Sequence, residues 1–333
     1  MGGFFAAKQP WSRHKHEILK RILQTKVWQH RNNITYIDGL AGAGSYADGS
    51  EGSPLVALNV FSEIYRELAQ KKGLSMHIDS VFVEQDPENY AQLAKILEDV
   101  KGIRVHHKQG SFYDCIDQAL DIAGGAQGVV FIDPFGVKDF SQEAVDKIRD
   151  FGRNIDVVIN FPIATMRRMV GQGRVYEGTR QTLEDKFQTP YQEDTGVFFE
   201  DYISRLRSHY SGVGWIPLKM KVTKGAELFY MTLCTNDINV YTSFNDFAAP
   251  ESQDVGGRVL DCLSGEPLSL KNLFFRLINS EFGYAKIKDY NKSIRQHLKH
   301  QEIKRRNSYH AQHYHFSTKG INIKPATNIY LSK

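Results

Sequence analysis

A glycine-rich segment carries the clearest chemical signal in the sequence. The segment Asp38-Gly39-Leu40-Ala41-Gly42-Ala43-Gly44 follows a short apolar run that is typical of a buried strand. Glycines in such a turn let the backbone approach a ligand, and an acidic residue at the strand end can bind the ligand's polar groups. A tight strand-to-helix turn also uses glycine for purely structural reasons. Because it follows the first strand of an α/β alternation, we interpret it as a ligand site, with candidate cofactor contacts Asp38, Gly39, Ala41, Gly42 and Gly44.

Acidic and hydroxyl residues also follow two later strands. Glu84 closes SVFVE, at the place where nucleotide-binding sheets hold ribose hydroxyls. A solvated carboxylate in a strand-to-helix turn is the structural alternative. Ser111 and Asp114, in QGSFYD, are candidates for contacts to the adenine of a cofactor, and either could instead cap the next helix.

A third segment, Asp133-Pro134-Phe135-Gly136, follows the apolar run GVVFI. It resembles the Asp-Pro-Pro-Tyr motif of amino-methyltransferases, in which the acid and a proline carbonyl accept hydrogen bonds from an exocyclic amino group and an aromatic ring stacks on the flipped base. Such chemistry needs positioning and an acceptor. Here the aromatic residue stands third in the segment. The role of the acid in that motif therefore applies to Asp133 more directly than the stacking role applies to Phe135. The alternative is a strand end followed by a turn. The candidate catalytic residues are Asp133, Pro134 and Phe135, and Asn160 after a later strand falls near the same rim.

The elements that must position these residues alternate along the chain. Apolar runs near residues 34, 80, 103, 128 and 155 are each followed or preceded by amphipathic stretches of helical period. Strands that alternate with helices and are continuously apolar predict a parallel sheet covered on both faces. We therefore expect an α/β, Rossmann-like doubly wound sheet over residues 1–262. Residues 163–212 break the rhythm and are predicted to be an insertion near the substrate.

The last part of the chain is basic and differs in style. Residues 265–333 hold 13 Lys and Arg against 4 Asp and Glu, whereas residues 1–264 hold 29 against 34. A helix, a basic helix over 285–306 and a hairpin over 307–320 outline a small winged helix-turn-helix domain over 265–333. A solvated basic surface is the alternative to nucleic-acid binding. The candidate phosphate contacts are Lys286, Lys288, Lys292, Arg295, Lys299, Arg305 and Arg306.

Composition limits the remaining classes. Of 333 residues, 41% are hydrophobic and 24% charged, as in soluble globular proteins. The three cysteines, Cys115, Cys234 and Cys262, are far apart, which indicates a reducing cytoplasm and neither a disulfide framework nor a zinc site. The histidines between 297 and 315 lack further ligands at metal spacing, so we predict no metal. No signal peptide or membrane span is expected.

Taken together, these motifs resemble the three-Cys-motif partner family (TcmP). The resemblance runs through WSRHKHEILKRIL, YIDGLAGAGSYADGSEGSPLVAL, VFVEQD, VVFIDPFG, VVINFP and LFYMTLCTN. It implies a class I S-adenosylmethionine-dependent methyltransferase fold, a C-terminal winged helix, and a bacterial or phage defence or mobile-element setting. It also implies a partner protein with three clustered cysteines. The segment TNDINVYTSFNDFA departs from the family pattern.

Two functional hypotheses follow. The first is an enzyme that transfers a methyl group from S-adenosylmethionine to an amino nitrogen, on a nucleic-acid base. The second is a non-catalytic module that binds the cofactor or scaffolds the three-cysteine protein and docks on nucleic acid. A nicotinamide-dependent dehydrogenase is disfavoured by the Asp-Pro-Phe-Gly strand end.

Overall fold

The computed structural model describes residues 9–30, 33–72, 77–170, 177–219, 226–263, 268–299, 303–307 and 327–331. They group into two compact units. The N-terminal unit is Met1–Tyr210 with Trp215–Cys234, and the C-terminal unit is Ser211–Gly214 with Thr235–Lys333. This division falls earlier in the chain than the domain boundary predicted after residue 262.

A seven-stranded sheet in the order β3-β2-β1-β4-β5-β7-β6 organises the N-terminal unit. The pairs β1–β2, β2–β3, β1–β4 and β4–β5 are parallel, and β7 pairs with β5 in the antiparallel direction. This is a Rossmann-like doubly wound sheet with an added antiparallel edge, which confirms the predicted fold class for this part. The strands are β1 Ile34–Asp38, β2 Ile78–Glu84, β3 Arg104–Gln109, β4 Gln127–Ile132, β5 Ile155–Phe161, β6 Gly212–Lys219 and β7 Glu227–Thr235.

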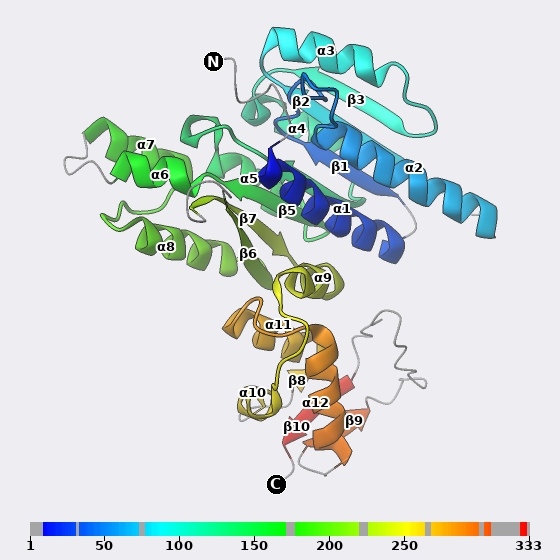
Figure 1. The fold of residues 1–333 in the computed structure, drawn as a ribbon, viewed down its shortest axis with the longest axis vertical. Coiled ribbons are helices and arrows are strands. Elements are labelled where there is room, and N and C mark those ends of the chain that lie inside the picture. The colour runs from blue at the N-terminus through cyan, green and yellow to red at the C-terminus, as the bar shows by residue number, and fades with distance from the viewer. Residues whose placement is uncertain are drawn as a thin grey trace. The chain divides into compact units, whose positions relative to one another are not determined.

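Helices cover both faces of this sheet. The strand order runs from β1 to β3 in one direction and from β4 to β5 in the other, so right-handed crossovers place the connecting helices on opposite faces. Figure 1 shows α1 and α2 lying together over one face, and α4 packs against α5. The helices are α1 Pro10–His30, α2 Ser53–Lys72, α3 Pro87–Leu97, α4 Phe112–Ala123, α5 Gln142–Phe151, α6 Ile163–Val170, α7 Glu177–Phe187 and α8 Thr195–Arg207, with a short 3₁₀ turn at Val137–Asp139.

Local sequence explains where these elements begin. The Asp86 side chain accepts hydrogen bonds from the amides of Glu88 and Asn89, and Pro87 takes the first helical position of α3. Strands β1, β4 and β5 are buried along almost their whole length, as expected for a sheet covered on both faces. The predicted insertion at 163–212 contains the helices α6, α7 and α8.

The C-terminal unit begins with helix α9, Ile238–Ala248. Tyr241 of α9 stacks on Phe275 and Phe282, and Phe244 contacts Phe282. This aromatic packing is why the segment after β7, which the sequence suggested only as divergent, groups with the C-terminal unit. The remaining elements are α10 Gly256–Cys262, β8 Leu268–Ser269, α11 Leu270–Ser280, α12 Ile287–Lys299, β9 Ile303–Asn307 and β10 Thr327–Leu331.

A small antiparallel sheet in the order β8-β10-β9 joins the strand before α11 to the two strands after α12. The prediction that one helix covers 285–306 is wrong at its end, because residues 303–307 pair with 327–331 as a strand. The predicted hairpin at 307–320 lies outside the described residues apart from Asn307. Among the helices that the structure describes, none is both long and apolar enough to cross a membrane.

Candidate active site at the carboxyl edge of the sheet

The glycine turn after β1 forms one wall of the candidate site. Gly42 and Gly44 have φ values of +63° and +81°, in the left-handed region that favours glycine. No atom lies within 4 Å of the position that a Gly42 Cβ would occupy, so the backbone there faces open space. A Cβ on Gly39 would instead lie 2.7 Å from the Phe112 ring, so this glycine permits close packing against α4. Ala41 is buried, and its amide donates to the Val83 carbonyl at 2.8 Å.

Asp38 is fully buried at the end of β1. Its carboxylate accepts hydrogen bonds from the Tyr36 hydroxyl at 3.1 Å and the Leu40 amide at 3.4 Å. Burial raises the pKa of Asp38 to about 7, with a further increase from the charge of Asp133, while hydrogen bonds from Ser53, Tyr36 and Leu40 act in the opposite direction. Asp38 therefore holds the start of the glycine turn through its hydrogen bond with the Leu40 amide, and its pKa lies near neutral pH.

Glu84 lies beside the same turn at the end of β2. One carboxylate oxygen accepts the Gly42 amide at 2.7 Å, and the other accepts the Asp86 amide at 2.7 Å. The predicted acidic residue and the predicted glycine turn are thus directly connected. Each carboxylate oxygen has two lone pairs, so these bonds orient the group and leave acceptor capacity for a ligand.

Asp133 lies at the end of β4, where its two carboxylate oxygens have different donors. Oδ2 forms an ion pair with the Lys15 ammonium of α1. Oδ1 accepts a hydrogen bond from Asn160 Nδ2, on β5, at 2.7 Å. The Asp133 side chain is 21% exposed, whereas Lys15 is 8% exposed. The structure thus brings together the predicted acid and the asparagine whose place near the rim the sequence had suggested.

The two residues after Asp133 differ in exposure. Pro134 is buried, whereas Phe135 exposes 54% of its surface. An exposed aromatic ring two residues after the acid offers an apolar face for stacking.

The residues predicted near a cofactor's adenine have a local structural part. The Ser111 hydroxyl accepts the Asp114 amide at 3.2 Å and donates to the Asp114 carboxylate at 2.5 Å, which caps α4. The Gly110 amide donates to the Glu84 carbonyl at 3.0 Å, so this loop adjoins the end of β2. The capping alternative is observed, and the loop is still placed beside the candidate site.

The predicted phosphate contacts fall into three groups. Lys288, Lys292, Arg295 and Lys299 are exposed and recur every three or four residues along α12, so they form one face that we call the α12 basic stripe. Lys286 and Lys288 both form ion pairs with Glu251, so both are partly neutralised before any ligand binds, and Lys286 is the less exposed of the two. Arg305 and Arg306 lie on β9, and their side chains lie outside what the structure describes.

Histidine and carboxylate groups give no sign of a metal site within the described ranges, where no cluster of three or more His, Cys, Asp or Glu could hold an ion. His297 bonds the Gly256 carbonyl at 3.1 Å through Nε2. His300, His310, His313 and His315 lie outside the described residues.

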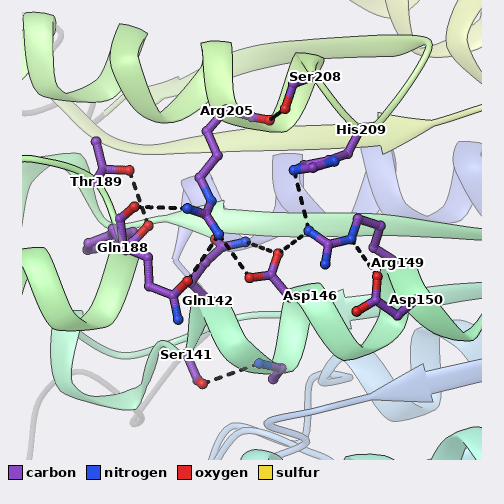
Figure 2. A network of polar contacts seen from close by, with 12 residues as sticks. Ser141, Gln142, Asp146, Arg149, Asp150, Gln188, Thr189, Arg205, Ser208 and His209 are labelled. Carbon is purple, nitrogen blue, oxygen red and sulfur yellow. Dashed lines mark hydrogen bonds and ion pairs between the residues drawn. The ribbon is translucent and has the colours of Figure 1, made fainter.

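A second polar cluster ties α8 to α5 and is structural. Figure 2 shows Asp146 between Arg149 and Arg205, which contact it at 2.8 Å and 2.9 Å, while Gln142 also donates to it. Arg205 further donates to the Gln188 carbonyl at 3.0 Å. In these bonds the charged groups of the cluster pair with one another. The cluster therefore connects the predicted insertion to α5.

Lys15 is the residue of this site that the sequence did not reveal. It lies in an ordinary amphipathic stretch, and its partner is 118 positions further along the chain. Burial lowers the pKa of Lys15, but the charges of Asp133, Tyr46 and Asp38 outweigh that effect and leave the pKa above its ordinary value of 10.5. Lys15 therefore remains a cation.

Comparison with known proteins gives a likeness of fold. No family model and no curated protein matches the chain. Among solved structures, the bifunctional kinase-methyltransferase WbdD is 8% identical with a TM-score of 0.36, and the match covers 67% of this chain and 39% of that one. The O-methyltransferase TomG from Streptomyces achromogenes, solved in complex with S-adenosylmethionine, is 12% identical with a TM-score of 0.35, covering 70% of this chain and 93% of that one. The chain thus spans about two fifths of WbdD. The strand order described above defines the fold as Rossmann-like, with an added antiparallel strand pair at one side.

Proposed function

We propose that the protein is an S-adenosylmethionine-dependent methyltransferase that acts on an amino nitrogen of a nucleic-acid base. One observation carries the proposal: the ends of the adjacent strands β2, β1 and β4 place Glu84, the glycine turn and Asp133 along one edge of the sheet. Open α/β sheets bind ligands at this carboxyl edge. The segment 133–136 adds hydrogen-bond acceptors that suit the amino group of a substrate.

The residues present fit the cofactor. The open backbone at Gly42 leaves room for a close ligand, and Glu84 is held beside it as an ionisable acceptor suited to ribose hydroxyls. Ser111, on the adjoining loop, and Asp114, in the first turn of α4, are the candidates for the adenine contact. S-adenosylmethionine supplies a methyl group activated on a sulfonium sulfur.

The chain's own residues then act on the acceptor. The Asp133 carboxylate accepts a hydrogen bond from the amino group, and the Pro134 carbonyl is the second acceptor of the motif. These hydrogen bonds orient the nitrogen lone pair, so the two residues contribute to the reaction by positioning the amino group. Phe135 offers an exposed ring on which a base can stack.

The acceptor class follows from the C-terminal unit. The α12 basic stripe presents four cations on one helix face. Cations spaced along a helix neutralise phosphates, and that interaction is sequence-independent. We propose that α11, α12 and the strands β9 and β10 form a winged helix that holds nucleic acid through this stripe.

A second candidate function is a binding module without turnover. It is favoured by one observation, that both Asp133 oxygens already have donors, Lys15 and Asn160. In this alternative the N-terminal unit binds the cofactor or scaffolds a partner protein. The resemblance to the three-Cys-motif partner family supports a protein with three clustered cysteines as that partner, in a defence or mobile-element setting.

Transfer of a tritiated methyl group separates the two functions. Wild type and Asp133→Ala are incubated with labelled S-adenosylmethionine and, separately, with bacterial DNA, total RNA and cell protein. Labelling of one nucleic-acid pool that is lost in the variant supports the enzyme. Cofactor binding by calorimetry without labelling of any pool contradicts autonomous catalysis and favours the binding module.

A further inference from the structure

Helix α1 is joined to the sheet by two lysine–aspartate pairs, one towards each edge. Lys15 pairs with Asp133, which directly follows β4, and Lys26 pairs with Asp156 at 2.9 Å, near the start of β5. The two lysines are 11 residues apart, about 16 Å along a helix. The Lys26 pair therefore lies towards the amino edge of the sheet, and the Lys15 pair lies at the carboxyl edge.

A lysine buried at this point is not explained by stability. Removing an ammonium and a carboxylate from water costs several kcal/mol per ion, and their attraction seldom gives a net gain over apolar packing. One buried pair is enough to fix the register of α1. The second pair consists of a covered lysine and the one aspartate that the proposed reaction requires to be reachable.

The donors around Asp133 also determine how its carboxylate is oriented. Lys15 donates to Oδ2, and Asn160 Nδ2 donates to Oδ1. Reversing the Asn160 amide would place its oxygen against the carboxylate, so its orientation is set by charge. With one donor on each oxygen, the plane of the carboxylate is fixed, and further lone pairs remain on both atoms.

We infer that Lys15 is a positioning residue of the methyl-transfer site, which holds the Asp133 carboxylate in a fixed plane so that it can accept a hydrogen bond from the substrate's amino group. The inference rests on the proposed function. The raised pKa of Lys15 agrees with it, because the ammonium that faces the carboxylate then keeps its charge. Lys15 moves no proton, since it stays an ammonium at neutral pH.

Four proteins test the inference: wild type, Lys15→Met, Lys15→Arg and Lys26→Met. Lys26→Met is the matched control, because it removes a second α1 ammonium from a buried aspartate but at the other edge of the sheet. Initial rates are measured with tritiated S-adenosylmethionine and the labelled nucleic-acid pool, below the unfolding temperature of every variant. Cofactor affinity is measured by calorimetry on the same samples.

We expect Lys15→Met to lower kcat about 100-fold, the size of effect produced by misplacing a reacting group by about 1 Å. The KM for nucleic acid and the cofactor affinity should change by less than about threefold. Lys15 contacts Asp133, so its removal affects the transfer step rather than the binding of either substrate. Lys15→Arg should recover at least about tenfold in kcat, because a guanidinium restores the charge. Lys26→Met should keep kcat within about threefold of wild type.

Two results would overturn the inference, and they are distinguishable. Equal kcat values for Lys15→Met and Lys26→Met, with an active wild type, would contradict Lys15 alone and leave the methyltransferase standing. An inactive wild type that binds cofactor would contradict the proposed function, and the positioning of Asp133 for transfer would fail with it.

Discussion

The two ends of helix α1 make the same kind of contact in two different surroundings. At one end, Lys26 and Asp156 are 2% and 1% exposed, and the pair is enclosed within the N-terminal unit. At the other end, Asp133 is 21% exposed and has Asn160 on its second oxygen. Both pairs consist of a lysine and an aspartate. Their position on the sheet, more than their residue types, therefore distinguishes a structural ion pair from a candidate reactive group.

The largest expected effect is on the enclosed pair. Lys26→Met leaves Asp156 as a buried charge without its ammonium, and removing one partner of a buried pair typically costs about 3–5 kcal/mol. We expect a loss of that size in the free energy of unfolding, measured by urea titration. The surface substitution Lys20→Met, whose pair with Glu63 is half exposed, serves as the control and should change stability by less than about 1 kcal/mol. Similar losses for the two variants would contradict the contrast between them.

Asp38 gives a pH-dependent version of the same comparison. Its pKa is about 7 in the folded chain against an ordinary value of 3.8. Between these values the folded state binds a proton that the unfolded state has released, so stability falls as pH rises through this window. The contribution is fully present below pH 3.8 and lost above about pH 7, with an amplitude on the order of 4 kcal/mol.

Asp38→Asn removes the titrating group and should flatten that part of the stability curve. Denaturant unfolding at half-unit pH steps from 4 to 8 measures the slope of the stability curve. Asp48→Asn, at an exposed aspartate shortly after the glycine turn, is the control. A curve for Asp38→Asn with the wild-type slope would show that the carboxyl group does not titrate in this window.

A smaller effect is expected for Glu84. Glu84→Gln keeps the shape of the side chain but exchanges a charged acceptor for a neutral amide next to the Gly42 and Asp86 amides. Hydrogen bonds to charged groups contribute about 1.5–3 kcal/mol, so the Kd for S-adenosylmethionine should rise at least about tenfold. Calorimetry measures this, and Glu88→Gln, in the first turn of α3, is the matched neutralisation outside the site. An unchanged Kd would remove Glu84 from the cofactor site.

The smallest effect concerns the α12 basic stripe. Replacing Lys292 by Gln should reduce the slope of log K against log salt for DNA or RNA by about 1, as expected for one lost phosphate contact. Lys286→Gln should change that slope less, because Lys286 is already paired with Glu251. Fluorescence anisotropy at four salt concentrations compares the two variants. Equal changes would argue against the stripe as the phosphate-binding face.

Sequence reasoning reached the elements whose pattern is local. The alternation of apolar strands and amphipathic helices predicted the doubly wound sheet, and the strand ends of β1, β2 and β4 predicted where Asp38, Glu84 and Asp133 lie. It missed what depends on long-range packing. Lys15 meets its partner 118 positions away, and the aromatic contacts of Tyr241 with α11 and Phe282 decide where the C-terminal unit begins. It also extended α12 into residues that pair as β9, because consecutive Lys and Arg residues fit a basic helix and an edge strand equally well.

Single-turnover methyl transfer by Asp133→Asn and Asp156→Asn, measured side by side with wild type, tests the central claim most directly. Both variants neutralise an aspartate that faces an α1 lysine, and they differ in the edge of the sheet that is affected. We predict that Asp133→Asn lowers the rate at least about 100-fold, in the range of a lost acceptor, whereas Asp156→Asn keeps the rate of the folded fraction near that of wild type. Equal rates for the two variants, or a faster rate for Asp133→Asn, would contradict the assignment of the carboxyl edge as the active site.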